Sequence, residues 1–452
     1  ADRETLTRGR RFYSIAKLNC VKMIDRSTKK ILEFETVPGH FSPTRFANLD
    51  DIKLVYKDGE HSRSVGTLRG LPEFPIPIDL QTLTSVPFGI FGRTHSGKTF
   101  LNKILLGNIL HSQVSQVFVF DTQSEYGWRS RADNSPGLKT FFSSKVKLLA
   151  LDKQTTPQAD EAFVIDRSEL RPQDLLIAFH DLTENMQDAL FRVYNHRAGY
   201  DLVAAVENTT EETFPDGTAH EIHSSVLQGL KNRMERLKRF KFIDATKKTN
   251  MLARTIEYIK NGYSIVLDFG QYGTDLSSYL VIANLVVRRL YETYSVSDTP
   301  NELPRLVVLL EEAHKFLEPS ISRYTIFDRL AREMRKFGLV LAMVDQRPSS
   351  IDDEILSQLA NRFILSLTDP KDIEAALTGP VDPHKWRSIV SAMPPRTALV
   401  FGDAIPVPTA IEVEHYEEGA MRKKWETGID PVEIAKKISG YSADQIKKVF
   451  DG

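Results

Sequence analysis

A strand–loop–helix pattern in the first quarter of the chain constrains the fold more than any other feature. Residues 92–99 read GRTHSGKT and fit the pattern G-x-x-x-x-G-K-[ST], the phosphate-binding loop or P-loop. The apolar run 88–91 precedes the loop, and apolar residues at helical spacing follow it from Phe100 onward. A buried parallel strand that leads into a helix is the context in which such a loop binds phosphate.

The residue types in this loop indicate how it holds a nucleotide. Gly92 and Gly97 allow backbone N–H groups to turn toward phosphate oxygens. Lys98 reaches the β- and γ-phosphates, and the hydroxyl of Thr99 binds Mg²⁺. The sequence therefore predicts ATP and Mg²⁺ as ligands, and a glycine turn without a ligand is the alternative. The other expected nucleotide contacts are Thr94, His95, Ser96 and Phe100.

Two acidic residues follow a second buried strand. The apolar run 306–310 leads directly to Glu311 and Glu312, which is the pattern of a Walker B motif. The first acid would hold the water shell of Mg²⁺, and Glu312 would polarise the attacking water as the general base. Asp is the usual first acid, and in this chain the longer Glu311 takes its place. A simple cap on the next helix is the alternative for both.

The composition is that of an ordinary folded protein and excludes several classes of site. Of the 452 residues, 26% are charged, and the formal net charge is −1, so a DNA site has to be local or formed by assembly. Cys20 is the one cysteine, which excludes an intrachain disulfide and argues against a zinc cluster. No apolar run approaches the ~18 residues that a membrane helix needs, and no signal-peptide pattern opens the chain. We therefore expect a cytoplasmic protein with no membrane partner.

Changes in the pattern of apolar and polar residues along the chain predict three parts. Residues 1–80 form a small N-terminal β-barrel, residues 81–414 an α/β core with a mostly parallel sheet, and residues 415–452 a helical tail. A polar segment at about 155–258 predicts a helical insertion in the core. The predicted core strands lie at 88–91, 117–121, 146–151, 263–268, 305–310, 339–344 and 363–367.

Short apolar runs between Gly/Pro turns suggest the strands of the N-terminal part. These runs are 12–16, 31–35 and 52–56, and several short strands at such spacing are typical of a small barrel or sandwich. The proline-rich segment 71–78 is expected to be extended, as a linker into the core.

Four motifs in the right order resemble the HerA family of the HerA/FtsK superfamily, which are hexameric DNA-translocating ATPases. After the P-loop they are FDTQSEYG at 120–127, LEEAHKFL at 310–317 and AREMRKFGL at 331–339, which is followed by DQRPS. The resemblance covers about residues 86–412 and implies a RecA-like P-loop NTPase core. This chain departs from the family at His95, where glycine is usual, at Glu311, and at Asp345, where serine is common.

The resemblance implies a site completed by a neighbouring subunit. In these rings a neighbour inserts an arginine at the γ-phosphate, and Arg335 is the best match, with Arg332 as the alternative. An arginine at that place neutralises charge in the transition state. Gln346 would sense the γ-phosphate or orient water. Asp121 and Glu125 would face the nucleotide or the central channel, and a helix-capping role is the alternative for them.

The resemblance also implies partners and a function. We expect a homo-hexamer that moves DNA through its central channel with ATP, as a translocase or helicase. A separate effector is expected beside it, either a NurA-like nuclease in DNA end resection or, in anti-phage defence, a nuclease or sirtuin-like NAD hydrolase. One alternative is an ATP-stabilised ring that serves as a scaffold for effector subunits with little translocation. The other is a conjugation-type motor related to TraG.

Overall fold

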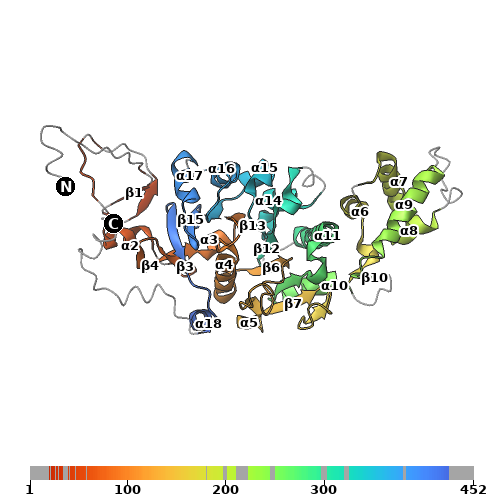
Figure 1. Ribbon diagram of the computed structural model, residues 1–452, viewed down its shortest axis with the longest axis horizontal. Helices are drawn as coiled ribbons and strands as arrows, with labels where there is room; N and C mark the ends of the chain where they lie inside the picture. The colour runs from red at the N-terminus through yellow and green to blue at the C-terminus, as the bar shows by residue number, and fades with distance from the viewer. Residues whose placement is uncertain are drawn as a thin grey trace, which may run out of the picture. The chain divides into compact units, whose positions relative to one another are not determined.

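The computed structural model describes two compact parts of the chain, 1–57 and 58–452. The residues described are 20–57 except 21, 26, 29, 34–38, 40 and 46, together with 59–179, 181–196, 201–209, 222–244, 250–296, 303–319, 325–379 and 383–426. Figure 1 shows the ribbon of the chain with its helices and strands labelled.

The first part contains one strand pair and one helix among its described residues. Strand β1 (Lys22–Ile24) pairs antiparallel with β2 (Ile31–Glu33), so the run at 31–35 begins with a strand, as predicted. The strand predicted at 52–56 is wrong, because helix α2 occupies Leu49–Val55. Asn48 and Asp51 form a capping box, which starts a helix at that point. The run 12–16 lies outside the described residues, and the barrel stays a prediction.

The second part is built on a twelve-stranded sheet. From β14 to β8 all neighbouring strands are parallel, whereas β15, β16, β3 and β4 add antiparallel pairs at one side. The predicted mostly parallel α/β sheet is therefore confirmed. In sheet order the strands are β4 (Leu71–Asp79), β3 (Ser62–Leu68), β16 (Thr409–Val413), β15 (Thr397–Phe401), β14 (Asn361–Ile364), β5 (Phe88–Phe91), β13 (Leu339–Asp345), β12 (Leu306–Glu311), β6 (Gln116–Asp121), β11 (Ser264–Asp268), β7 (Val146–Ala150) and β8 (Glu161–Ala162).

The proline-rich segment 71–78 is extended, as predicted, but it is a strand of the main sheet rather than a linker. Strand β4 pairs with β3, and β3 pairs with β16 of the core. Because β4 is the outermost strand of the sheet, its prolines leave few ladder hydrogen bonds unmade. The compact core consequently begins at Asp58, and not at residue 81.

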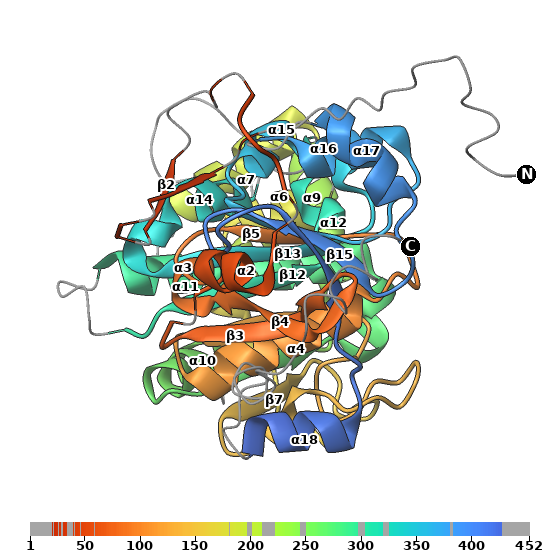
Figure 2. The ribbon, with the colours of Figure 1, turned by 90° about the vertical axis from the view of Figure 1, so that its left-hand side faces the viewer.

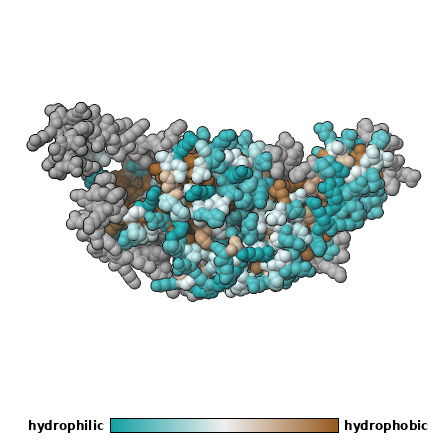
Figure 3. Space-filling view, in the orientation of Figure 1, coloured by the Kyte–Doolittle hydropathy of each residue, from teal (hydrophilic) through white to brown (hydrophobic). Residues whose placement is uncertain are grey.

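Helices cover both faces of the central strands. The strands β5, β12 and β13 are buried along their whole length, as the continuous apolar runs predict for parallel strands between helical layers. Helices α4 (Lys98–Ser112) and α11 (Leu276–Val296) pack beside the sheet (Figure 1). The face of the molecule in Figure 3 is mainly hydrophilic, with only small scattered apolar patches. Among the described helices, none has both the length and the apolar character that crossing a bilayer requires.

The predicted helical insertion contains α6 (Pro172–Ala178), α7 (Glu184–His196), α8 (Leu202–Asn208), α9 (Ser224–Leu237) and α10 (Met251–Lys260). Figure 1 shows α7, α8 and α9 grouped beyond α11. Helix α9 and the residues just after it carry a stretch of basic residues between 231 and 241, and three of them have acidic partners. Arg233 and Arg236 contact Asp181, at 2.9 and 3.2 Å, and Lys238 contacts Glu235 at 2.5 Å. An ion-paired helix face is a poor phosphate-binding surface.

The described end of the chain is helix α18 (Glu418–Glu426), which confirms that the tail begins as a helix. Helix α18 lies beside α4 (Figure 2). Trp425 is buried in this contact, with its ring 4.9 Å from that of Phe141 and its Nε1 donating to Asn108 Oδ1 at 3.0 Å. Gly107 leaves room for the indole, since a Cβ there would lie 2.2 Å from it. The part of the predicted helical tail beyond residue 426 lies outside the described residues.

The Trp425→Ala variant is expected to lower the free energy of unfolding by about 3 kcal/mol, because it removes a buried aromatic side chain and leaves a cavity beside α4. Chemical denaturation measures this change. The exposed Glu417 lies on the same segment, and Glu417→Ala is the matched control. Equal stability of the two variants would contradict a structural role for the indole.

Candidate active site

Three adjacent parallel strands bring the predicted motifs to one edge of the sheet. In the β5–β13 ladder Phe91 is level with Asp345, and in the β13–β12 ladder Val344 is level with Glu311. The P-loop, the Walker B acids and the segment after β13 therefore meet where these strands end. The backbone N–H of Gly92 donates to the carbonyl of Asp345 at 3.1 Å, which fastens the start of the P-loop to β13.

The backbone of the P-loop explains two of its residues. Gly97 has φ 103°, a conformation that glycine adopts without strain. His95 has φ 61°, in the left-handed region where side chains with a Cβ are uncommon. The departure from the usual glycine therefore falls at a position whose backbone suits glycine. Gly92 is required for space, since a Cβ would lie 2.7 Å from Ser96 Oγ and 2.9 Å from Leu365 Cβ.

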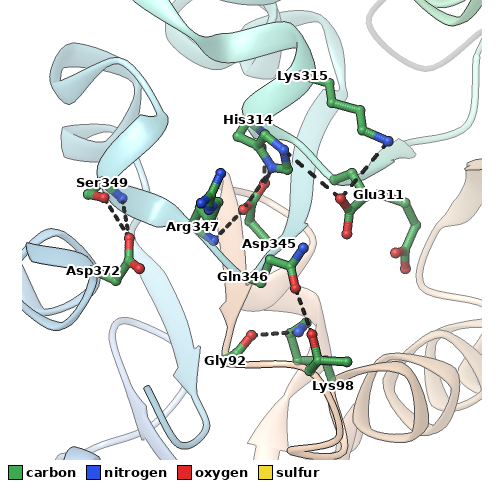
Figure 4. A network of polar contacts seen from close by, with 12 residues as sticks. Gly92, Lys98, Glu311, His314, Lys315, Asp345, Gln346, Arg347, Ser349 and Asp372 are labelled. Atoms are coloured by element: carbon green, nitrogen blue, oxygen red, sulfur yellow. Dashed lines mark hydrogen bonds and ion pairs between the residues drawn. The ribbon is translucent and has the colours of Figure 1, made fainter. Parts of the chain in front are cut away.

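The Lys98 ammonium group lies inside the P-loop. Its Nζ donates to the carbonyls of Gly92 and Arg93, at 2.5 and 3.1 Å. Burial lowers the pKa of Lys98, and nearby carboxylates, Glu311 first among them, oppose that shift. A cation held in the hollow of a P-loop is placed to meet phosphate oxygens. Figure 4 shows Lys98 beside Gly92, below Gln346.

Gln346 joins the P-loop to the end of β13. Its Oε1 accepts a hydrogen bond of 2.8 Å from the hydroxyl of Thr94. The predicted position of Gln346, directly after the strand next to the P-loop strand, is confirmed. An amide held against the loop can respond to a group bound there, since both of its polar atoms lie at the phosphate end of the sheet.

Glu311 is buried and held by tyrosine hydroxyls. The hydroxyl of Tyr126 donates to Glu311 Oε1, and the hydroxyl of Tyr279 donates to the Glu311 carbonyl at 2.7 Å. Burial raises the pKa of Glu311 to about 8, and the Tyr126 hydrogen bond opposes the shift. The longer side chain of glutamate, compared with aspartate, thus contacts the loop after β6.

Oxygen ligands suited to Mg²⁺ gather beside the P-loop. The side chain of Thr99 hydrogen-bonds to Glu125, and burial raises the pKa of Glu125. The Glu311 carboxyl also belongs to this group, because it is close enough to Lys98 to interact electrostatically with its ammonium group. Mg²⁺ prefers hydroxyl, carboxylate, water and phosphate oxygens, so these residues fit the metal. The sequence predicts Thr99 and Glu311 as the metal ligands, and the structure adds Glu125 beside Thr99. The neighbouring Asp121 instead accepts the backbone N–H groups of Glu125 and Tyr126, at 2.9 and 2.8 Å, and so holds this loop in place.

Glu312 follows in an unusual backbone conformation. It has φ 53°, and a non-glycine residue held in this region is a form of strain often found at functional sites. Its side chain is 25% exposed, and its Oε2 lies 4.0 Å from both His314 Nε2 and Lys315 Nζ. An accessible carboxylate beside the phosphate-binding loop can accept a proton from water.

Comparisons with known proteins show the family of this chain. A family model described as "Helicase HerA, central domain" matches residues 63–290, about half of the chain. The chain belongs to the HerA helicase family. It is therefore an ATPase. The "DNA double-strand break repair helicase HerA" of Pyrococcus furiosus is 22% identical over 425 residues, which cover 84% of this chain and 74% of that protein. The protein of the same name from Saccharolobus solfataricus is 24% identical over 450 residues, or 97% of this chain and 83% of the relative.

Solved structures confirm the P-loop NTPase fold of this HerA-family chain. VirB4 of Thermoanaerobacter pseudethanolicus superposes with a TM-score of 0.57 at 14% identity, covering 81% of this chain and 99% of that one. The bacterial conjugative coupling protein TrwBdeltaN70 gives a TM-score of 0.51, also at 14% identity, over 84% and 95% of the two chains. These likenesses concern the fold alone.

The structure separates the two candidate arginines of the HerA-family motif. The sequence of residues 326–337 is consistent with one helix, but in the structure α14 (Phe327–Arg332) ends before the 3-10 turn η4 (Met334–Phe337). Arg332 already forms ion pairs with Asp328, at 2.6 Å, and with Glu354. Arg335 lies in η4 and is exposed, and no described residue forms an ion pair with it. Of the two, Arg335 is therefore the one available to another chain.

Arg335 does not lie at the P-loop of its own chain. It precedes β13, whereas the P-loop lies where β13 ends. With seven residues in β13, the two edges of the sheet are about 20 Å apart. The sheet thus brings together the P-loop, Glu311, Glu312 and Gln346, and it leaves Arg335 on the opposite edge.

Two predicted nucleotide contacts have other partners within the chain. The ring of Phe100 stacks on Tyr416, with centroids 5.8 Å apart. Ser96 is buried, its Oγ donates to the Arg93 carbonyl at 2.7 Å, and its own carbonyl accepts from the backbone N–H of Arg396. Both residues support the shape of the loop, and their contact with nucleotide stays a prediction.

One pair of residues in the site was not predicted as such. His314 contacts Asp345, a residue noted in the sequence only as a departure from the family. Each residue on its own stands at a recognisable place in the sequence. Asp345 ends the buried strand β13, and His314 follows the end of the buried strand β12 by a few residues. Their pairing depends on the order of strands in the sheet, which the sequence does not state.

Proposed function

We propose that this chain is a subunit of a ring-shaped, ATP-driven DNA translocase or helicase, assembled as a homo-hexamer. The observation that supports it most directly is the place of Arg335, exposed and on the sheet edge opposite its own P-loop. An arginine at that place can reach a γ-phosphate only if the nucleotide belongs to a neighbouring subunit. A site shared between subunits couples hydrolysis to movement of one subunit against the next.

Within one subunit, the chemistry is divided among the residues at the P-loop edge. Lys98 and the loop N–H groups bind the phosphates, and Glu312 accepts a proton from the attacking water. Thr99, Glu311 and Glu125 would hold Mg²⁺, which when bound neutralises charge on the β- and γ-phosphates. Gln346 orients the water or senses the γ-phosphate through its contact with Thr94.

DNA is proposed as the translocated polymer because the HerA relatives are named as DNA double-strand break repair helicases. The paired basic residues of α9 argue that DNA contacts lie elsewhere, in a channel formed by the ring. A channel repeats each subunit's basic residues around the DNA, so a chain of net charge near zero can still bind phosphates. A separate chain would supply the effector, a NurA-like nuclease or a defence enzyme. A cytoplasmic location is part of the same proposal.

The test is ATP turnover with and without duplex or single-stranded DNA, measured on the purified full chain. We expect DNA to raise the turnover number several-fold, and the Lys98→Ala variant to show no turnover with either. Turnover that is the same with and without DNA, in rings whose size is confirmed by mass measurement, would support the scaffold and contradict the motor. Repeating the assay with the protein encoded beside this one tests for the effector.

A further inference from the structure

A buried carboxylate lies behind the proposed catalytic base. The side chain of Asp345 is 0% exposed, so its charge has to be compensated by hydrogen bonds or cations. It accepts the backbone N–H of His314 and that of Arg347, each at 2.6 Å. Its third partner is the His314 ring, whose Nδ1 lies 3.0 Å from Asp345 Oδ2. Figure 4 shows the ring of His314 directly beside Asp345.

The geometry determines what each ring nitrogen of His314 faces. Nδ1 faces the Asp345 side chain, which already accepts two backbone N–H groups, and can donate its own N–H there. On the other side of the ring, Nε2 lies 4.0 Å from Glu312 Oε2. A ring between two carboxylates is most stable with a proton on both nitrogens. The hydrogen bond to Asp345 raises the pKa of His314, and burial of the ring opposes the shift.

Glu312 needs an external support of this kind. Its backbone is in the left-handed region, and its side chain reaches the nucleotide side of the sheet from a short turn rather than from a regular element. Lys315 Nζ is equally close, but it ends a flexible four-carbon chain and costs rotamer entropy to fix. His314, in contrast, contacts Asp345 at two points, since its backbone N–H donates to the carboxylate and its ring contacts it through Nδ1.

The same strand end also contacts the P-loop. Asp345 is followed directly by Gln346, whose Oε1 accepts from the hydroxyl of Thr94. A chain of contacts therefore runs from the P-loop through the end of β13 to the turn that carries Glu312. These contacts join the ends of the three neighbouring strands β5, β13 and β12, where the site lies.

We propose that His314 is the positioning residue of Glu312: its imidazole, anchored on the buried Asp345, holds the general base at a fixed place relative to Gln346 and the P-loop. This proposal rests on the proposed function, because it takes Glu312 as the base. It also gives Asp345 a role in this chain, since a serine at that position would provide no charge to anchor an imidazolium.

The decisive variant is His314→Asn. The asparagine amide can still donate to Asp345 in place of Nδ1, so the buried carboxylate keeps a partner, but the shorter asparagine side chain no longer approaches Glu312, which keeps only the flexible Lys315 at 4.0 Å. We expect the turnover number to fall about 10- to 100-fold, because small displacements of a catalytic group are costly. The dissociation constant for ATP should stay within about twofold of the wild-type value, since the partners of the His314 ring are Asp345 and Glu312, which lie outside the P-loop.

The matched control is Ser349→Ala. Ser349 lies in the same segment after β13 as Gln346, and its replacement removes a hydrogen bond of 2.6 Å to Asp372. It should leave both turnover and ATP affinity close to wild type. A His314→Asn variant with turnover within about twofold of the wild type would overturn the proposal. So would a loss of turnover matched by an equal loss of ATP affinity and a lower melting temperature, which indicates a purely structural role.

Double variants separate this proposal from the function on which it rests. In a Glu312→Gln background, adding His314→Asn should change the residual turnover no further, because the residue it positions is already inactive. If Glu312→Gln is inactive and His314→Asn is fully active, only the positioning role fails. If Glu312→Gln itself turns over ATP normally, the assignment of the base fails, and the role of His314 fails with it.

Discussion

Glu312→Gln is expected to lower ATP turnover by about 10²- to 10⁴-fold, the usual contribution of a general base, while ATP binding persists. Glutamine has nearly the same size and shape as glutamate, so the left-handed turn at this position is preserved. Its amide cannot accept the proton of the attacking water. Phosphate release measures the loss of turnover, and equilibrium binding of a fluorescent ATP analogue measures the retained affinity.

Lys98→Ala is the contrasting variant for this prediction. The Lys98 ammonium lies within the loop that surrounds the phosphates, so its removal should weaken binding as well as abolish turnover. The two variants are thus distinguished by affinity and not by activity. Wild-type turnover in Glu312→Gln would show that another group accepts the proton, and the Walker B assignment would then be wrong.

The P-loop and the Walker B acids could be predicted because each is a contiguous pattern. The apolar runs 88–91 and 306–310 become buried parallel strands, and the residues just beyond them reach the same edge of the sheet. Gln346 was implied by the resemblance to the HerA family, and in the structure it directly follows β13, the strand beside β5. A parallel strand that is buried on both faces is apolar at nearly every position, so a continuous apolar run predicts such a strand well.

The two errors in the N-terminal part have different causes, one local and one long-range. The run 52–56 contains Ile52, Leu54 and Val55, which resembles a strand by composition. The capping box of Asn48 and Asp51 satisfies backbone donors at the start of a helix and outweighs that weak preference. The pairing of β3 with β16 joins residues more than 300 positions apart, and no local pattern announces such a contact.

The details of the site that could not be predicted are also contacts between distant segments. His314 and Asp345 are 31 residues apart, and their meeting depends on β12 and β13 being neighbours. The choice between Arg332 and Arg335 depends on the ion pair of Arg332 with Glu354 and on the end of α14 at Arg332. In the sequence both arginines belong to one apparent helix.

Arg335→Ala subunits should be inactive alone and should regain turnover when mixed with Lys98→Ala subunits. Loss of an arginine at the γ-phosphate costs about 10³- to 10⁵-fold in turnover. At a mixed interface, the Arg335→Ala subunit contributes an intact P-loop and its Lys98→Ala neighbour contributes Arg335. When equal amounts of the two variants mix at random in a closed ring, roughly a quarter of the interfaces have this arrangement. Phosphate release over a series of mixing ratios should therefore pass through a maximum at intermediate composition.

Arg332→Ala is the control that makes this result specific. Arg332 is bound within its own chain by Asp328 and Glu354, so its loss should affect local stability more than turnover, and mixing with Lys98→Ala should give no maximum. Native mass measurement has to show that mixed rings form in both series. With mixed rings present, a flat profile for Arg335→Ala would place its function within one subunit. Because Arg335 and the P-loop of the same subunit lie at two edges of the sheet that are about 20 Å apart, Arg335 could not then act at the γ-phosphate. The proposal of a site shared between subunits would have to be abandoned.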